Sequence, residues 1–160
     1  MNVHHMDTEK YLTAISQVIG QGNQVAIPVR GSSMQPFLAD SRDAVLIGPV
    51  NRRLRRGDIV LYQREGGQFV LHRIIRVDRA GSSGERYYIR GDAQSAAEGP
   101  VEPRQICALV IRVRRKGKWL AAYAPINMTF RYLWHRRSFP RRAVCVLYRQ
   151  ICLALRRAWR

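Results

Sequence analysis

The chain has 160 residues, enough for one domain with its own hydrophobic core and too few for two independent catalytic units. Hydrophobic residues make up 46% of it and charged residues 24%, a balance that excludes a disordered, collagen-like or polytopic membrane protein. The net charge of +17 belongs to one end, because all 11 acidic residues lie within residues 1–102 while residues 103–160 hold 15 basic residues. This end is expected to face an anionic partner, either nucleic acid or lipid.

Residues 1–22 are predicted to form an N-terminal amphipathic helix. Its apolar residues recur at helical spacing, with Asp7 as the N-cap and Gly20 or Gly22 as the end. The first residues lack the apolar core of a signal peptide, and the uncharged stretch 11–29 contains too many polar residues for a membrane-spanning helix. We therefore expect a cytoplasmic protein, or one held peripherally on a membrane.

Residues 23–123 are predicted to form a mainly β domain built from short hairpins. Runs of β-forming residues alternate there with turn signals, and the glycine-containing segments 65–67 and 81–84 are the expected loop tips. The predicted strands are residues 24–29, 44–47, 58–62, 69–77, 86–90, 106–113 and 119–123.

Residues 124–160 are predicted to form a basic tail with an amphipathic helix between Ala143 and Trp159. Apolar residues line one face of this helix, while Arg142, Arg149 and Arg156 recur every seven residues on another. The apolar face either packs on the β domain and leaves the arginines in water, or lies in an anionic lipid surface. The preceding segment RYLWHRRSFPRR mixes aromatic residues with arginine, a composition typical of membrane interfaces.

The three cysteines point to neither a zinc site nor a disulfide framework. Cys107, Cys145 and Cys152 form no CxxC motif and lie in apolar surroundings, so we expect buried thiols in a reducing compartment. No metal or cofactor is expected.

The turn-rich segment GSSMQP follows the first predicted strand directly. Gly31 permits a sharp turn and Pro36 fixes the exit, so a serine at position 32 or 33 would sit on rigid backbone beside amide groups. A nucleophile next to an oxyanion site needs this arrangement, although an ordinary turn has the same composition.

A serine nucleophile needs a base, and His72 is the candidate inside the β domain. Lys10 lies in the predicted N-terminal helix, while Lys116 and Lys118 flank a late turn. His72 belongs to the run VLHRII, where it shares one strand face with Val70 and Ile74. The alternative role for His72 is that of a half-buried histidine at the edge of the core.

A carboxylate that holds the imidazole in one tautomer would complete the catalytic group. Asp92, in YYIRGDAQ, is the best placed by sequence, and Asp58, in RRGDIVLY, is its competitor. Asp40 and Asp43 are expected to be loop acids.

The segments GSSMQP, RRGDIVLY, VLHRII and IRGDAQ, in this order, resemble the signal peptidase family of serine endopeptidases. This family shares a β fold with the self-cleaving repressor peptidases, the S24/S26 type. The resemblance implies Ser33 as nucleophile, His72 as general base in place of the commoner lysine, and Asp92 as the acid that supports it. It also implies a substrate and oxyanion region, formed by Gly31, Ser32, Met34 and Pro36.

The chain departs from the family pattern in three respects. The N-terminal membrane anchor of typical members is not found. Gly31 stands where many members have a serine that helps to bind the oxyanion, so the second oxyanion donor is open. Gln94 stands where the box around Asp92 usually continues with asparagine.

The sequence therefore predicts a serine endopeptidase that cleaves an extended peptide, such as a leader peptide or pre-protein, and whose tail either binds an anionic membrane surface or packs on the β domain. One alternative is a repressor-like regulatory domain that cleaves itself or only dimerises, although few residues precede Ser33 for a DNA-binding domain. Another is a basic nucleic-acid-binding module, which the β segments disfavour because they show no aromatic stacking pattern.

Overall fold

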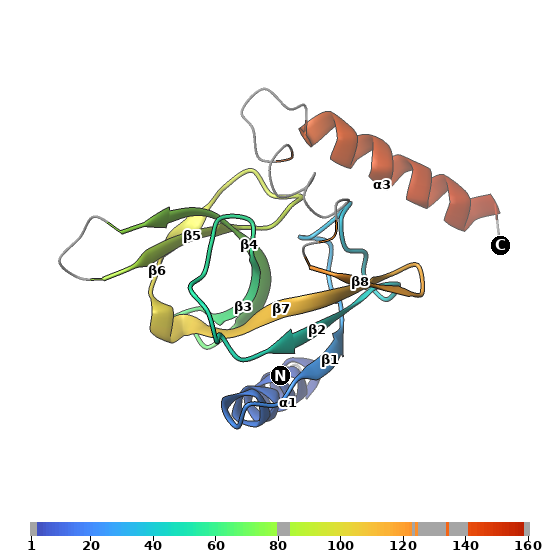
Figure 1. Ribbon diagram of the computed structural model, residues 1–160. Coiled ribbons are helices and arrows are strands. Elements are labelled where there is room, and N and C mark those ends of the chain that lie inside the picture. Colours follow the sequence, from blue (N-terminus) through green and yellow to red (C-terminus); the bar gives the residue numbers. More distant parts are fainter. Residues whose placement is uncertain (1–2, 80–83, 123, 125–133, 135–140, 159–160) are drawn as a thin grey trace.

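The computed structural model describes residues 3–79, 84–122, 124, 134 and 141–158. Its centre is one antiparallel sheet of eight strands, in the order β1-β2-β7-β3-β4-β5-β6, with β8 paired to β7 (Figure 1). The predicted mainly β fold is therefore confirmed. The strands are β1 (Val25–Pro28), β2 (Ala44–Gly48), β3 (Ile59–Gln63), β4 (Phe69–Asp78), β5 (Arg86–Arg90), β6 (Glu98–Val101), β7 (Ile106–Arg115) and β8 (Lys118–Ala121).

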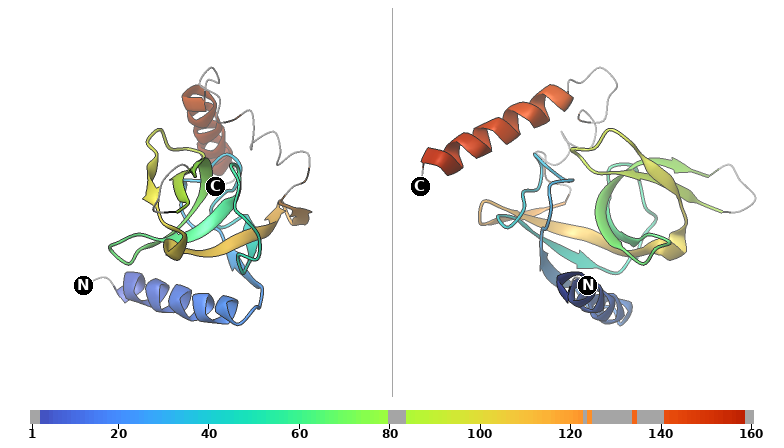
Figure 2. Two further views of the ribbon diagram at one scale, coloured as in Figure 1. Left: turned by 60° about the vertical axis from the view of Figure 1, so that its left-hand side comes forward. Right: turned by 180° about the vertical axis from the view of Figure 1, so that it is seen from behind.

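Among the described residues, one α-helix lies on each side of this sheet (Figures 1 and 2). Helix α1 (Val3–Gly20) packs beneath β1 and β7 and buries Ile15 and Ile19. Helix α3 (Arg141–Ala158) lies on the other side. Because α1 begins at Val3, the prediction of Asp7 as its N-cap is wrong, and Asp7 lies inside the helix.

The sheet curls on itself, so that its central strands are buried on both faces (Figure 2). Bulges interrupt four of the strand pairings, among them β3 with β7 and β4 with β5, and bulges increase local twist and bending. In β3, Ile59 and Leu61 belong to the core between α1 and the sheet, while Val60 and Tyr62 belong to a second core inside the curled sheet. Residues on both faces of a strand are thus held rigidly.

The seven predicted strands are present with small shifts at their ends, and β6 was missed. Its sequence, Glu-Gly-Pro-Val, contains two residues that strands generally avoid. Proline is tolerated here because β6 lies at the edge of the sheet, where an amide hydrogen is not needed on the outer side.

The cysteine prediction holds only in part. Cys107 is a free thiol but is half-buried rather than buried, and Cys145 is half-buried as well. Burial raises the pKa of the Cys107 thiol, so this group is a poor nucleophile at neutral pH. The side chain of Cys152 lies outside the described residues.

Candidate active site

The segment between β1 and β2 fixes Ser33 in a rigid turn. Gly31 has φ +81°, in the left-handed region that glycine adopts without strain, and its amide donates to Asp40 Oδ1 at 2.9 Å. The turn closes with the Gln35 amide donating to the Ser32 carbonyl at 3.1 Å, and Met34 is buried in the core. Ser33 is therefore held on anchored backbone, and Asp40 has a structural role in the turn.

His72 reaches the same place from the curled part of the sheet. It lies opposite Val60 in the pairing of β3 with β4, and only 1% of its surface is exposed. Val70 and Ile74 contribute to the core on that face of β4, as predicted. The surrounding residues therefore leave the ring almost no exposed surface.

A turn after β5 joins these two segments. The Ala93 amide donates to the Ser33 carbonyl at 2.8 Å. A Cβ atom on Gly91 would lie 2.6 Å from that carbonyl oxygen and 3.0 Å from His72 Nε2, so only glycine fits. The Ser33 carbonyl oxygen and His72 Nε2 thus both lie close to Gly91. Three of the four segments that carried the family resemblance converge here.

Ser33 and His72 line one cavity of about 510 Å³. In the turn between β1 and β2, Ser33 and Met34 line the cavity, whereas the neighbouring Ser32 is exposed. Other walls come from Tyr11 and Leu12 of α1, from β1 and from residues 69–72 of β4. Most of these side chains are apolar, which suits the apolar side chains of a peptide.

Two strand edges face this cavity. β1 is the end strand of the sheet, and β5 pairs with β4 only from Arg73 onward, so among the described strands residues 69–72 pair on one side only, with β3. Backbone groups on such edges can accept an extended chain as an additional strand.

His72 is neutral at pH 7. Burial is the main cause that lowers its pKa to about 4, against an ordinary value of 6.5. Among the described residues, neither ring nitrogen has a hydrogen-bond partner. The ring is thus in the form that accepts a proton.

A family model described as Peptidase S24-like matches residues 2–84, which is more than half of the chain. The chain belongs to the Peptidase S24-like family. No curated protein is similar enough to count as a match. The matched span includes Ser33 and His72, whereas Asp92 lies beyond it.

In this S24-like chain the two acids proposed for His72 bind arginines. Asp92 is 1% exposed and forms a bidentate ion pair with Arg73, with Nε–Oδ1 at 2.9 Å and Nη2–Oδ2 at 2.8 Å. Its negative charge nevertheless raises the pKa of His72. Asp58 accepts hydrogen bonds from Arg52 at 2.9 and 3.1 Å and from the Arg55 amide at 2.8 Å. Asp58 thus organises the loop before β3.

The carboxylate at the His72 ring that sequence reasoning missed is Glu98. Its Oε1 lies 3.6 Å from His72 Nδ1. No sequence signal identified it, because Glu98 is at the start of β6, the strand that escaped prediction, and outside the four motif segments.

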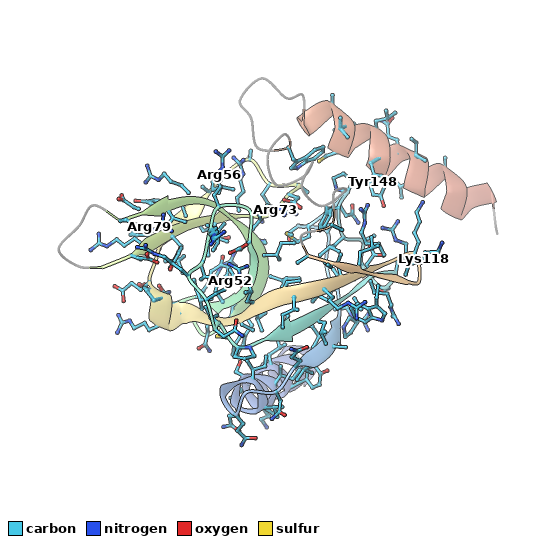
Figure 3. The ribbon with its side chains drawn as sticks, viewed as in Figure 1. Arg52, Arg56, Arg73, Arg79, Lys118 and Tyr148 are labelled. Atoms are coloured by element: carbon cyan, nitrogen blue, oxygen red, sulfur yellow. The ribbon has the colours of Figure 1, made fainter. Side chains whose placement is uncertain are left out.

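The tail of this S24-like chain contacts the domain at two described points. Trp134 is 4% exposed, and its Nε1 donates to the Asp92 carbonyl at 2.8 Å, so this aromatic residue of RYLWHRRSFPRR is buried rather than free for a membrane. Figure 3 shows Tyr148 on the side of α3 facing the domain, where its hydroxyl accepts from Arg42 Nη1 at 3.3 Å. Leu147 and Ile151 of α3 remain 58% and 49% exposed. Among the described helices, none has the length and apolar character needed to cross a bilayer.

Proposed function

We propose that this chain is a serine endopeptidase of signal-peptidase type, with Ser33 as nucleophile, His72 as general base and Asp92 as a supporting acid. The observation that supports it most is the meeting of the Ser33 turn and His72 Nε2 at Gly91, on one cavity between two strand edges. A neutral buried histidine beside a rigid serine is the arrangement that acyl transfer needs.

In the proposed reaction, the Ser33 hydroxyl oxygen bonds to the carbonyl carbon of the substrate while its proton passes to His72 Nε2. The carbonyl electron pair moves to oxygen, where the Ser33 amide is the proposed first hydrogen-bond donor. The protonated ring then gives its proton to the leaving amine as the carbon–nitrogen bond breaks. A water molecule then bonds to the carbonyl carbon of the acyl-enzyme and passes a proton to His72, and the ring returns that proton to the Ser33 oxygen as the ester bond breaks. The proposed reaction uses no metal or cofactor.

Asp92 acts in this proposal through its charge. Its carboxylate is bound to Arg73, and the net effect of the buried negative group is to raise the pKa of the ring and favour the imidazolium that forms transiently. The Arg73–Asp92 pair also fixes the turn after β5, which contains Gly91 and Ala93.

The substrate in this proposal is an extended peptide. Its backbone pairs with the edges of β1 and of residues 69–72, and an apolar side chain enters the cavity. Incubation of the full chain with a proteome-derived peptide library, followed by mass spectrometry of new termini, tests for this activity. Ser33→Ala and His72→Ala abolish cleavage if the proposal holds, and Ser32→Ala retains it.

A regulatory domain that cleaves itself or only dimerises is the other candidate, since both kinds of protein share this type of fold. To separate the two candidates, active chain is incubated with the peptide library and, in parallel, with full chain carrying Ser33→Ala as a possible substrate. Cleavage of library peptides supports an endopeptidase acting in trans. Cleavage confined to the chain's own backbone, or a stable dimer without cleavage, supports the regulatory candidate.

We also propose that α3 holds the protein on an anionic membrane. Val146, Leu147, Ile151 and Leu153 are exposed, and residues 103–160 contain no acidic residue that would repel anionic lipid. An exposed apolar surface on a basic helix is the composition of interfacial helices. The nucleic-acid alternative uses the same charge but gives these apolar side chains no partner.

A further inference from the structure

Glu98 lies on the Nδ1 side of the His72 ring, whereas Nε2 is the nitrogen proposed to take the proton of Ser33. Its Oε1 is 3.6 Å from Nδ1, whereas Nε2 is the atom that meets the Ser33 backbone at Gly91. A general base that takes a proton on Nε2 must carry its own hydrogen on Nδ1, and a carboxylate on that side favours this tautomer.

Neighbouring side chains hold Glu98 in place and keep it ionised. Tyr62 donates its hydroxyl to Oε2 at 2.6 Å, Arg64 donates Nε to the same oxygen at 2.7 Å, and Arg64 Nη2 bonds Oε1. The hydrogen bonds from Arg64 are the main cause that lowers the pKa of Glu98. The carboxylate therefore faces the ring as a fixed negative charge.

Charged side chains from three segments of the chain affect the pKa of His72. Glu98 of β6 gives the strongest effect that raises the pKa of the ring, Arg64 beyond β3 lowers it, and Asp92 beyond β5 raises it less. Tyr62 of β3 lies with its ring centroid 6.2 Å from that of His72. Glu98 thus leads both in proximity to Nδ1 and in the size of its charge effect.

Resting on the proposed function, we propose that Glu98 is the positioning residue for His72, holding the Nδ1–H tautomer and stabilising the imidazolium formed during catalysis. At 3.6 Å the contact is longer than a hydrogen bond, and such contacts commonly shorten when substrate fills the site. Asp92, whose two carboxylate oxygens accept hydrogen bonds from Arg73, supports the ring through its charge.

Glu98→Gln removes the charge and keeps the shape, and Arg64, about a third exposed, stays solvated in this variant. Glu85→Gln is the matched control. Glu85 also binds a tyrosine and arginines, namely Tyr87 at 2.7 Å, Arg79 at 3.1 Å and Arg53, but it is not among the groups that shift the pKa of His72. Glu98→Asp retains the charge on a shorter side chain and provides a second, conservative variant.

The test is nitrogen-15 NMR of the histidine rings in the full chain at pH 7, with His72 assigned by loss of its signals in His72→Gln. We expect the Nδ1–H tautomer in wild type and in Glu85→Gln, a several-fold shift toward Nε2–H in Glu98→Gln, and an intermediate state in Glu98→Asp. An Nε2–H ring in wild type, or the same tautomer in Glu98→Gln as in wild type, overturns the proposal.

Kinetics on a cleaved library peptide give a second readout. Glu98→Gln should lower kcat by about 100-fold at nearly unchanged KM and move the acid limb of the pH profile to lower pH, because the pKa of His72 falls. An unchanged acid limb contradicts the role of Glu98. If wild type cleaves nothing, the proposed function fails, while the NMR result still decides whether Glu98 sets the tautomer.

Discussion

Arg73 and Asp92 form a bidentate ion pair with almost no exposed surface, and Asp92 belongs to the turn after β5 that contacts Ser33. Arg73 also donates Nη1 to the Gly57 carbonyl at 3.1 Å and lies with its guanidinium 4.8 Å from the centre of the Phe37 ring. Figure 3 shows Arg73 within the curled sheet rather than at its surface. The pair therefore links β4, the turn after β5 and the loop before β3.

Asp92→Asn is expected to destabilise the protein as well as slow it. The change leaves a buried guanidinium without its counter-charge, which typically costs about 3–5 kcal/mol in the free energy of unfolding. Chemical denaturation measures this loss. The paired change Asp92→Asn with Arg73→Met removes both charges and should recover much of the stability. A single variant as stable as wild type would contradict the structural part of this prediction.

The pKa of His72 predicts how stability depends on pH. The ring titrates near 4 in the folded protein and near 6.5 when unfolded, so between these values the unfolded state binds the additional proton. Stability should rise with pH from 4 to 6.5, and His72 contributes on the order of 3 kcal/mol over this window. His72→Gln should lack this contribution. Equal pH dependence in the two proteins, measured by urea denaturation, would show that His72 is not buried in its neutral form.

His72→Lys tests the role of the base. A lysine must lose its proton to act as a base, and burial lowers its pKa without bringing it to that of a buried histidine. We expect low activity with an optimum at higher pH than wild type, which should remain active down to about pH 5 because the pKa of His72 is about 4. Initial rates from pH 4 to 10 measure both limbs. An identical acid limb in the two proteins would exclude position 72 as the base.

Membrane binding by α3 is tested in the full chain with Leu147→Gln and Ile151→Gln combined. Loss of the exposed apolar side chains should weaken sedimentation with vesicles containing phosphatidylserine, while the charge contribution, roughly 1 kcal/mol per basic group near the surface, remains. Val50→Gln, at an exposed position outside the tail, is the control. Equal sedimentation of all three proteins, or strong salt-sensitive DNA binding by wild type, would count against a membrane role.

Truncating the whole tail is a poorer test, for a structural reason. Trp134 is buried and hydrogen-bonded to the Asp92 carbonyl, so a chain that ends near residue 123 loses part of the support of the site.

Local patterns in the sequence predicted most of the fold, because the strands of this sheet are rich in β-forming residues and end at turns. They also predicted the turn at Gly31 and the face of β4 that carries His72. The partners of the acidic residues could not be predicted, because they depend on which strands the curled sheet brings together. Asp92 binds Arg73 from 19 residues away in the sequence, and Glu98 lies beside His72 from the edge strand β6, which does not pair with β4. Glu98 was harder still to predict because its strand, β6, contains glycine and proline, which strands generally avoid.

Cleavage by Ser33→Ala, compared with Ser32→Ala, is the most direct measurement of whether the Ser33 and His72 site is a peptidase. Both variants lose one hydroxyl from the same turn, but only Ser33 lines the cavity shared with His72. In the peptide-library assay we expect Ser32→Ala to cleave at a rate similar to wild type. Ser33→Ala should cleave no faster than His72→Ala, because removing either member of a unit removes nearly all of its activity. Retained cleavage in Ser33→Ala would show that the nucleophile lies elsewhere and would contradict the proposed mechanism.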